Sequence, residues 1–190
     1  MADPTVTKYV ELLGDLKLVR RLQPWIGNIG KRVVKTPKVY VRDSGIVHAL
    51  LEIESYEQLL GHMVCGGSWE GFAIENLVEA AGYREPYFYR TSNGAEVDLI
   101  FEKAGKPFVA IEIKRSSNPK VEQGFHIACE DLQIPHRICV YPGSDSWNIR
   151  NGVIIEPLHR ALDRIEHLLD ERTAARKKRA RGPGAASALS

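Results

Sequence analysis

Apolar and polar residues alternate most clearly in two short segments near the middle of the chain, residues 96–101 and 108–114. Alternation with a period of two residues is typical of half-buried β-strands. The segment between them combines lysine with glycine and proline, which favour a turn. The pattern therefore predicts a β-hairpin, and a turn centred on Gly105 places Leu99 opposite Ile111 on an apolar face.

The other face of this predicted hairpin is charged. There Asp98 lies opposite Glu112, and Glu96 lies opposite Lys114. Two carboxylates directly across a strand pair repel each other, so we expect a cation between them, with a divalent metal as the candidate. Lys114 would then stabilise a developing anion. The alternative is a solvated sheet face, on which Lys114 pairs with Glu96 or Glu112 and no chemistry takes place.

Helical spacing of apolar residues appears in two other places, residues 4–14 and 68–81. We expect the apolar stripe of the second helix to face the core, and it consists of Trp69, Phe72, Ala73, Leu77 and Ala80. A further helix of about fourteen residues is expected after Pro119, within the usual range of helix lengths. A last helix is expected after Pro157.

Strand-like segments account for most of the remaining apolar residues. They lie at residues 16–22, 38–42, 87–90, 137–141 and 153–155. From residue 68 onward the predicted order is α-β-β-β-α-β, so the expected fold class is α/β, with a mixed sheet flanked by helices. We divide the chain into a small winged-helix-like remnant with a linker (1–30), a main domain (31–170) and a basic disordered tail (171–190).

Charge is distributed unevenly along the 190 residues, although the formal net charge is only +2. Residues 172–190 contain six of the 26 basic residues and no acidic one, which leaves 20 basic against 24 acidic residues in the body. A polyanionic partner would therefore need a local basic patch on an acidic body. The tail itself is interpreted as a solubilising extension or as a nucleic-acid contact.

The cysteine content indicates a reducing compartment. There are three cysteines, an odd number, and none forms a CxxC pair, which argues against a disulfide framework or a structural zinc site. The first residues lack the charged and apolar regions of a signal peptide. No run of 18 or more apolar residues is present. We therefore expect a cytoplasmic protein that does not span a membrane.

The hairpin sequence resembles the PD-(D/E)XK nuclease fold, in the segments Gly94–Ile100 and Ala110–Ser116. Three other motifs are similar to those of domain-of-unknown-function family 4143: residues 31–46, residues 67–72 and residues 89–91. This resemblance covers about residues 5–160. It implies a restriction-endonuclease-like core and a place in the C-terminal part of prokaryotic AAA-type ATPases.

The nuclease resemblance implies a set of catalytic residues. A helix glutamate, Asp98 and Glu112 would hold Mg²⁺ or Mn²⁺, and Lys114 would position the attacking water. Glu70 matches the family's Trp-Glu-x-Phe pattern, and Glu75 lies on the same predicted helix. Because five residues turn a helix by about 140° beyond a full turn, both cannot point into one site, and Glu70 is preferred.

Four further residues are candidates for contact with a nucleic acid. Arg90 precedes the hairpin, Arg115 and Ser116 follow the Glu-x-Lys strand, and Gln123 lies on the helix expected after it. Each has an ordinary alternative as a surface or packing residue. His126 lies on the same expected helix, where a structural role is the more common one.

Two functions remain open from the sequence. The first is a DNA-binding, Mg²⁺-dependent phosphodiester hydrolase. The second is a non-catalytic interaction or regulatory domain of an ATPase, which the acidic body favours because nucleases usually present a broad basic surface. Residues 27–31 are rich in glycine but lack the spacing of a phosphate-binding loop, so this chain is not expected to hydrolyse ATP. An ATPase would be a separate partner or a lost upstream module.

Overall fold

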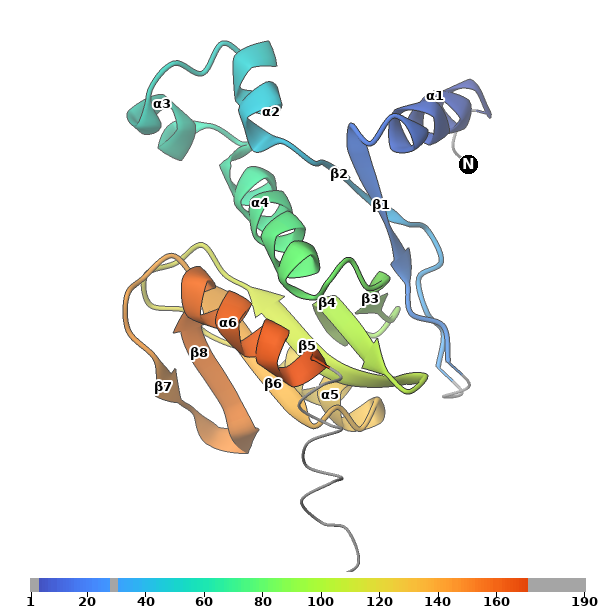
Figure 1. Ribbon diagram of the computed structural model, residues 1–190, viewed down its shortest axis with the longest axis vertical. Coiled ribbons are helices and arrows are strands. Elements are labelled where there is room, and N and C mark those ends of the chain that lie inside the picture. The colour runs from blue at the N-terminus through green and yellow to red at the C-terminus, as the bar shows by residue number, and fades with distance from the viewer. Residues whose placement is uncertain (1–3, 28–30, 171–190) are drawn as a thin grey trace, which may run out of the picture.

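A single eight-stranded mixed sheet runs through the protein, in the order β2-β1-β3-β4-β5-β6-β8-β7 (Figure 1). The computed structural model describes residues 4–27 and 31–170, so the predicted tail at 171–190 lies outside the described residues. The strands are β1 (Val19–Pro24), β2 (Lys38–Val41), β3 (Pro86–Arg90), β4 (Glu96–Lys103), β5 (Lys106–Ile113), β6 (His136–Tyr141), β7 (Trp147–Asn148) and β8 (Val153–Pro157).

Helices cover both faces of this sheet. They are α1 (Pro4–Asp15), α2 (Ser44–Leu50), α3 (Tyr56–Gly61), α4 (Cys65–Ala80), α5 (Gln123–Asp131) and α6 (Leu158–Leu169), with a short 3-10 helix at Arg150–Gly152. Helices α4 and α6 contribute to one buried cluster and α5 to the other, while α1, α2 and α3 gather at one end of the molecule (Figure 1). The predicted α/β class and the order α-β-β-β-α-β from α4 to β6 are confirmed.

The central hairpin has the predicted register, with Leu99 opposite Ile111. Its turn consists of Ala104 and Gly105, whose φ angles of 54° and 71° are both positive, as a type I′ hairpin turn requires. The expectation of a single apolar face was wrong. Ile100 on β4 is as fully buried as Leu99, because helices on both sides of the sheet bury both sets of alternating side chains.

Two predicted helices differ from their structures. The helix expected after Pro119 has nine residues instead of about fourteen and begins only at Gln123. On α4 the expected stripe is only partly buried: Leu77 is fully covered, but Phe72 is 44% exposed. Helix α4 lies against the sheet at its C-terminal end and extends past it at its N-terminal end (Figure 1), so residues near its start have less to pack against.

The N-terminal segment shares the main sheet. Strand β1 pairs antiparallel with β2 and parallel with β3. Glu75 of α4 holds this segment in place, because its carboxylate accepts hydrogen bonds from Arg20 of β1 and from Arg42, which directly follows β2. Strands from both sides of the predicted boundary at residue 30 therefore belong to one sheet.

The cysteines and the helix lengths bear on two further predictions. All three cysteines are unpaired and buried; the sequence had predicted the absence of a disulfide framework but not their burial. Within the described ranges, none of the helices combines the length and the apolar character that crossing a membrane would require.

Candidate functional site

A β-bulge positions Asp98. Tyr87 pairs with Ile100 and Tyr89 with Val97, so two residues of β4, Asp98 and Leu99, lie opposite the single residue between the two tyrosines. One carboxylate oxygen of Asp98, Oδ2, accepts a hydrogen bond from the backbone N–H of Ile113 at 3.0 Å. The Asp98 side chain therefore binds a backbone donor of β5 two residues beyond Ile111, which pairs with Leu99 at that end of the β4–β5 ladder.

The ammonium group of Lys38 lies among three carboxylates. Its Nζ atom is 3.2 Å from Asp98 Oδ1, 3.2 Å from Glu70 Oε1 and 3.3 Å from Glu96 Oε1. These residues come from three elements, since Lys38 is on β2, Glu70 on α4 and the other two on β4. Burial would lower the pKa of Lys38, but the three carboxylates outweigh it and raise that pKa, so the amine stays charged. We call these four residues the Lys38 cluster.

Tyr40 adds a hydroxyl group to the Lys38 cluster. It lies two residues after Lys38 on β2, on the same face of the strand, and its OH donates to Glu70 Oε1 at 2.5 Å. Burial and the nearby charge of Glu70 raise the pKa of Tyr40. Its proton is therefore retained, and Glu70 is held by two donors from β2.

Glu112 and Lys114 form a separate pair beside this cluster. Lys114 Nζ is 2.7 Å from Glu112 Oε1, so these two side chains pair as the sequence alternative expected, although Glu112 does not lie on a solvated face. The Glu112 side chain is only 8% exposed. Burial, and then the charge of Asp98, raise the pKa of Glu112 to about 7. This carboxyl group is thus far less acidic than that of an ordinary glutamate.

The carboxylates as they lie do not fit a divalent metal. Among residues 4–27 and 31–170, no group of three or more acidic, histidine or cysteine side chains is arranged to hold such an ion. Both oxygens of Asp98 already accept hydrogen bonds, and Glu70 and Glu96 are paired with the same ammonium group. Lys38 provides the cation that the sequence pattern had led us to expect as a metal.

The other candidates for nucleic-acid contact lie around this region on the surface. Arg90 is exposed and pairs with Glu96 at 3.4 Å. Arg115 is exposed and donates to Cys65 Sγ at 3.3 Å. Ser116 stabilises a local turn, because its Oγ accepts a hydrogen bond from the N–H of Asn118 at 3.1 Å.

Three more polar residues complete the comparison with the sequence predictions. Gln123 is exposed at the start of α5. His126 is further along this helix, and its Nδ1 atom is buried without a hydrogen-bond partner among the described residues. Glu75 pairs with Arg20 and Arg42 and does not belong to the Lys38 cluster. Burial would raise its pKa, but the hydrogen bonds from Arg20 and Arg42 lower it.

Sequence reasoning missed Lys38 and Tyr40. They alternate in the predicted strand at 38–42, so a shared face was readable from the sequence. The sequence does not show which helix this strand, β2, would face. Strand β2 joins the sheet through β1, and the pairing of β1 with β3 joins segments about sixty residues apart.

Residues 65–160, half of the chain, match the model of the family described as domain of unknown function DUF4143. The chain belongs to this family. The DUF4143 segment contains Glu70, Asp98, Glu112 and Lys114. Residues 1–57 match a second family model, domain of unknown function DUF8612. The DUF4143 match is thus narrower than the resemblance over residues 5–160 had suggested, and the motif at 31–46, with Lys38 and Tyr40, lies in the DUF8612 segment.

Two uncharacterized mycobacterial proteins are similar to this DUF4143 protein, one from Mycobacterium bovis and one from Mycobacterium tuberculosis. Each is 38% identical to it over 162 residues. The matched region is 85% of this chain but 36% of either relative, so the chain spans about a third of the length of the curated relatives it matches. No solved structure matches.

Proposed function

We propose that this protein is a nuclease-like, DNA-associated domain that works with an ATPase and does not cleave DNA while Lys38 holds its carboxylates. The observation that carries this proposal is the position of the Lys38 ammonium, within 3.3 Å of three carboxylates. An ammonium group neutralises these charges, but it offers no open coordination position and does not activate water as a divalent metal does.

The state of Glu112 supports the same function. In the nuclease fold that the sequence resembles, this residue would be an ionised metal ligand. Here burial raises its pKa to about 7, and Lys114 is its immediate partner. A carboxyl group that is costly to ionise and already paired is a poor donor for a hard cation.

A second candidate is Mg²⁺- or Mn²⁺-dependent hydrolysis of a phosphodiester. One observation favours it: Asp98, Glu112 and Lys114 converge at the end of one hairpin, in a core that follows the order of a restriction-endonuclease-like fold. The arginines Arg90 and Arg115 are exposed nearby and suit a phosphate backbone. This candidate requires Lys38 to leave the carboxylates.

The ATPase belongs to the proposal because of the family resemblance and the length of the relatives. Family members of the kind the sequence resembles form the C-terminal part of AAA-type ATPases, and the relatives are nearly three times as long as the matched region. We propose that the ATPase is supplied by a separate chain or by an adjoining module. A cytoplasmic location is part of the same proposal, since all three cysteines are unpaired.

The test compares DNA binding with DNA cleavage in the same samples. The purified chain is incubated with linear, circular and branched DNA, with Mg²⁺ or Mn²⁺, beside the variants Asp98→Asn and Lys114→Ala. We expect retention of DNA without metal-dependent cleavage. Cleavage that needs metal and is lost in both variants would instead establish the second candidate. Absence of both binding and cleavage would remove DNA from the function.

A further inference from the structure

A groove of about 330 Å³ is lined by residues of α2, α3 and α4, together with Arg115 and Pro142. This volume is at the lower end of the range for sites that hold small organic groups, about 300–1,000 Å³. Trp69 lies in its wall, next to Glu70 in the chain, and its Nε1–H donates to the backbone oxygen of Lys114 at 3.1 Å. The groove therefore begins where the strand that carries Glu112 ends.

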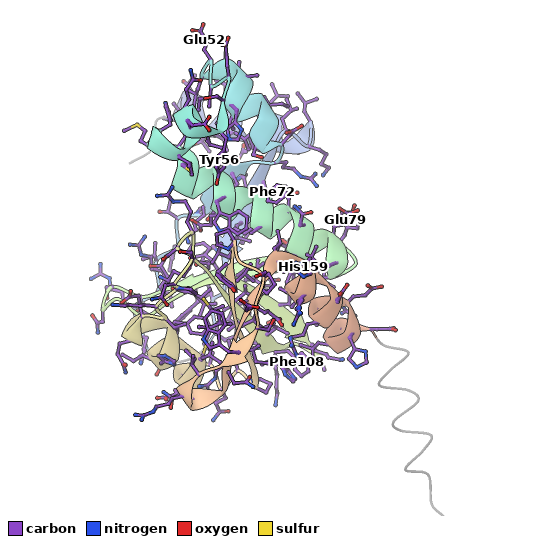
Figure 2. The ribbon with its side chains drawn as sticks, turned by 90° about the vertical axis from the view of Figure 1, so that its left-hand side faces the viewer. Glu52, Tyr56, Phe72, Glu79, Phe108 and His159 are labelled. Carbon is purple, nitrogen blue, oxygen red and sulfur yellow. The ribbon has the colours of Figure 1, made fainter. Side chains whose placement is uncertain are left out.

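Aromatic rings in this groove are open to solvent. Tyr56 of α3 is 69% exposed and Phe72 of α4 is 44% exposed. Figure 2 shows both on the face of the molecule turned toward the viewer, with Tyr56 above Phe72. Trp69 lies next to Phe72, with 6.2 Å between the ring centroids. Exposed aromatic rings gathered in one concave place indicate a binding surface more than a packing defect.

The charged side chain that lines the groove is a cation, Arg115. Among the described residues that line it there is no aspartate or glutamate, although the chain contains 24 acidic residues. The Arg115 guanidinium at its edge donates to Cys65 Sγ, and no carboxylate in the described part of the chain pairs with it. Helix α4 begins at Cys65, in the groove wall, without a side-chain cap, so the positive end of its dipole adds to the charge of Arg115.

We infer that this groove binds single-stranded nucleic acid, with bases stacked on Tyr56 and Phe72 and a phosphate against Arg115. Aromatic rings beside a cation are the usual platform for single strands, because every base presents a flat face. A duplex keeps its base faces stacked inside and cannot offer them. The inference rests on the proposed DNA association and adds the form of the strand. An apolar peptide is the competing occupant, but it would not require Arg115.

Fluorescence anisotropy with a labelled oligothymidylate of about twelve nucleotides, within the usual site sizes, and with a duplex of equal length tests this inference. The buffer contains a chelator, so cleavage plays no part. The variants are Tyr56→Ala, Phe72→Ala, Phe72→Leu and Arg115→Ala. Tyr9→Ala is the matched control, because Tyr9 is 63% exposed and lies on α1, outside the groove lining.

We expect the single strand to bind more tightly than the duplex. Each aromatic-to-alanine variant should weaken its binding by roughly five- to a hundredfold, the effect of losing one stacked base, and Tyr9→Ala should have no effect. Phe72→Leu should weaken binding as Phe72→Ala does, since leucine is apolar but has no flat face. Arg115→Ala should lower the slope of log affinity against log salt by about 0.7, the value for one phosphate contact in a single strand.

Three results would overturn the inference. Equal binding of duplex and single strand, unchanged in all groove variants, would leave DNA association standing and move it elsewhere on the surface. Full binding by Phe72→Leu beside lost binding by Phe72→Ala would mean that the groove recognises apolar bulk, as in a peptide. Failure of both oligonucleotides to bind would reject the proposed DNA association together with the groove.

Discussion

Replacing Lys38 with methionine should destabilise the protein. Methionine keeps an unbranched side chain of similar length but removes the charge shared by Asp98, Glu70 and Glu96. The Lys38 side chain is 21% exposed, so the loss lies between that of an exposed ion pair, at most about 1 kcal/mol, and that of a buried charge left without its partner, about 3–5 kcal/mol. We expect about 2–3 kcal/mol, because the cluster is mostly but not fully buried.

Thermal unfolding followed by circular dichroism measures this effect. For a domain of this size each kcal/mol shifts Tm by about 2–4 °C, so Lys38→Met should melt about 4–12 °C below the wild type. The matched control is Lys8→Met, at an exposed lysine on α1. Millimolar Mg²⁺ should raise the Tm of Lys38→Met more than that of the wild type, because the variant leaves three carboxylates without a cation.

Two outcomes would refute this reasoning. A Lys38→Met variant as stable as the wild type would mean that the ammonium contributes nothing to holding β2 against α4 and β4. A wild-type protein stabilised by Mg²⁺ as strongly as the variant would mean that Lys38 does not occupy the position of a divalent cation, and it would favour the metal-dependent candidate.

Three further predictions concern other parts of the structure. The folded state raises the pKa of Glu112 from 4.5 to about 7 and so binds this proton more tightly than the unfolded chain. Urea unfolding should therefore show stability falling as pH rises across that interval, and Glu112→Gln should flatten the fall. Glu75→Gln should cost about 2–3 kcal/mol, because two arginines lose a charged partner, whereas Glu79→Gln, at an exposed position of the same helix, should cost almost nothing by the same measurement. Gly124→Ala should lower stability by about 1–3 kcal/mol, as overpacking does, because its Cβ would collide with the carbonyl oxygen of Gly94; Gly61→Ala, with open space around it, is its control, and equal Tm values for the two would contradict the packing argument.

The elements that local sequence patterns determine were predictable. The two alternating segments specified the hairpin and placed Leu99 opposite Ile111 correctly. The turn alone does not give this pairing, because it pairs Lys103 with Lys106 and the register shifts by one residue after Phe101. Helix α4 was recognised from its apolar spacing, and Gly82, which follows it with a φ of 67°, is typical of a helix end.

Features that depend on distant parts of the chain were not predictable. The positions of β4 and β5 were apparent, but burial on both faces follows from where α4, α5 and α6 pack. The exposure of Phe72 depends on how far α4 extends past the sheet. For the candidate site, the sequence identified the acidic residues, but the cation that accompanies them comes from β2. Periodicity describes one element at a time and carries no information about its neighbours in space.

The Lys38 cluster also constrains how this protein can be inherited. Its lysine and tyrosine belong to the segment matched by one family model, and its carboxylates belong to the segment matched by another. A recombination event that joined residues 65–160 to a different leading sequence would transmit three acidic groups without the amine that neutralises them. The recipient would have to provide a positive charge of its own at that place. We therefore expect the two segments to be inherited together, and recombination at the boundary between them to be disfavoured.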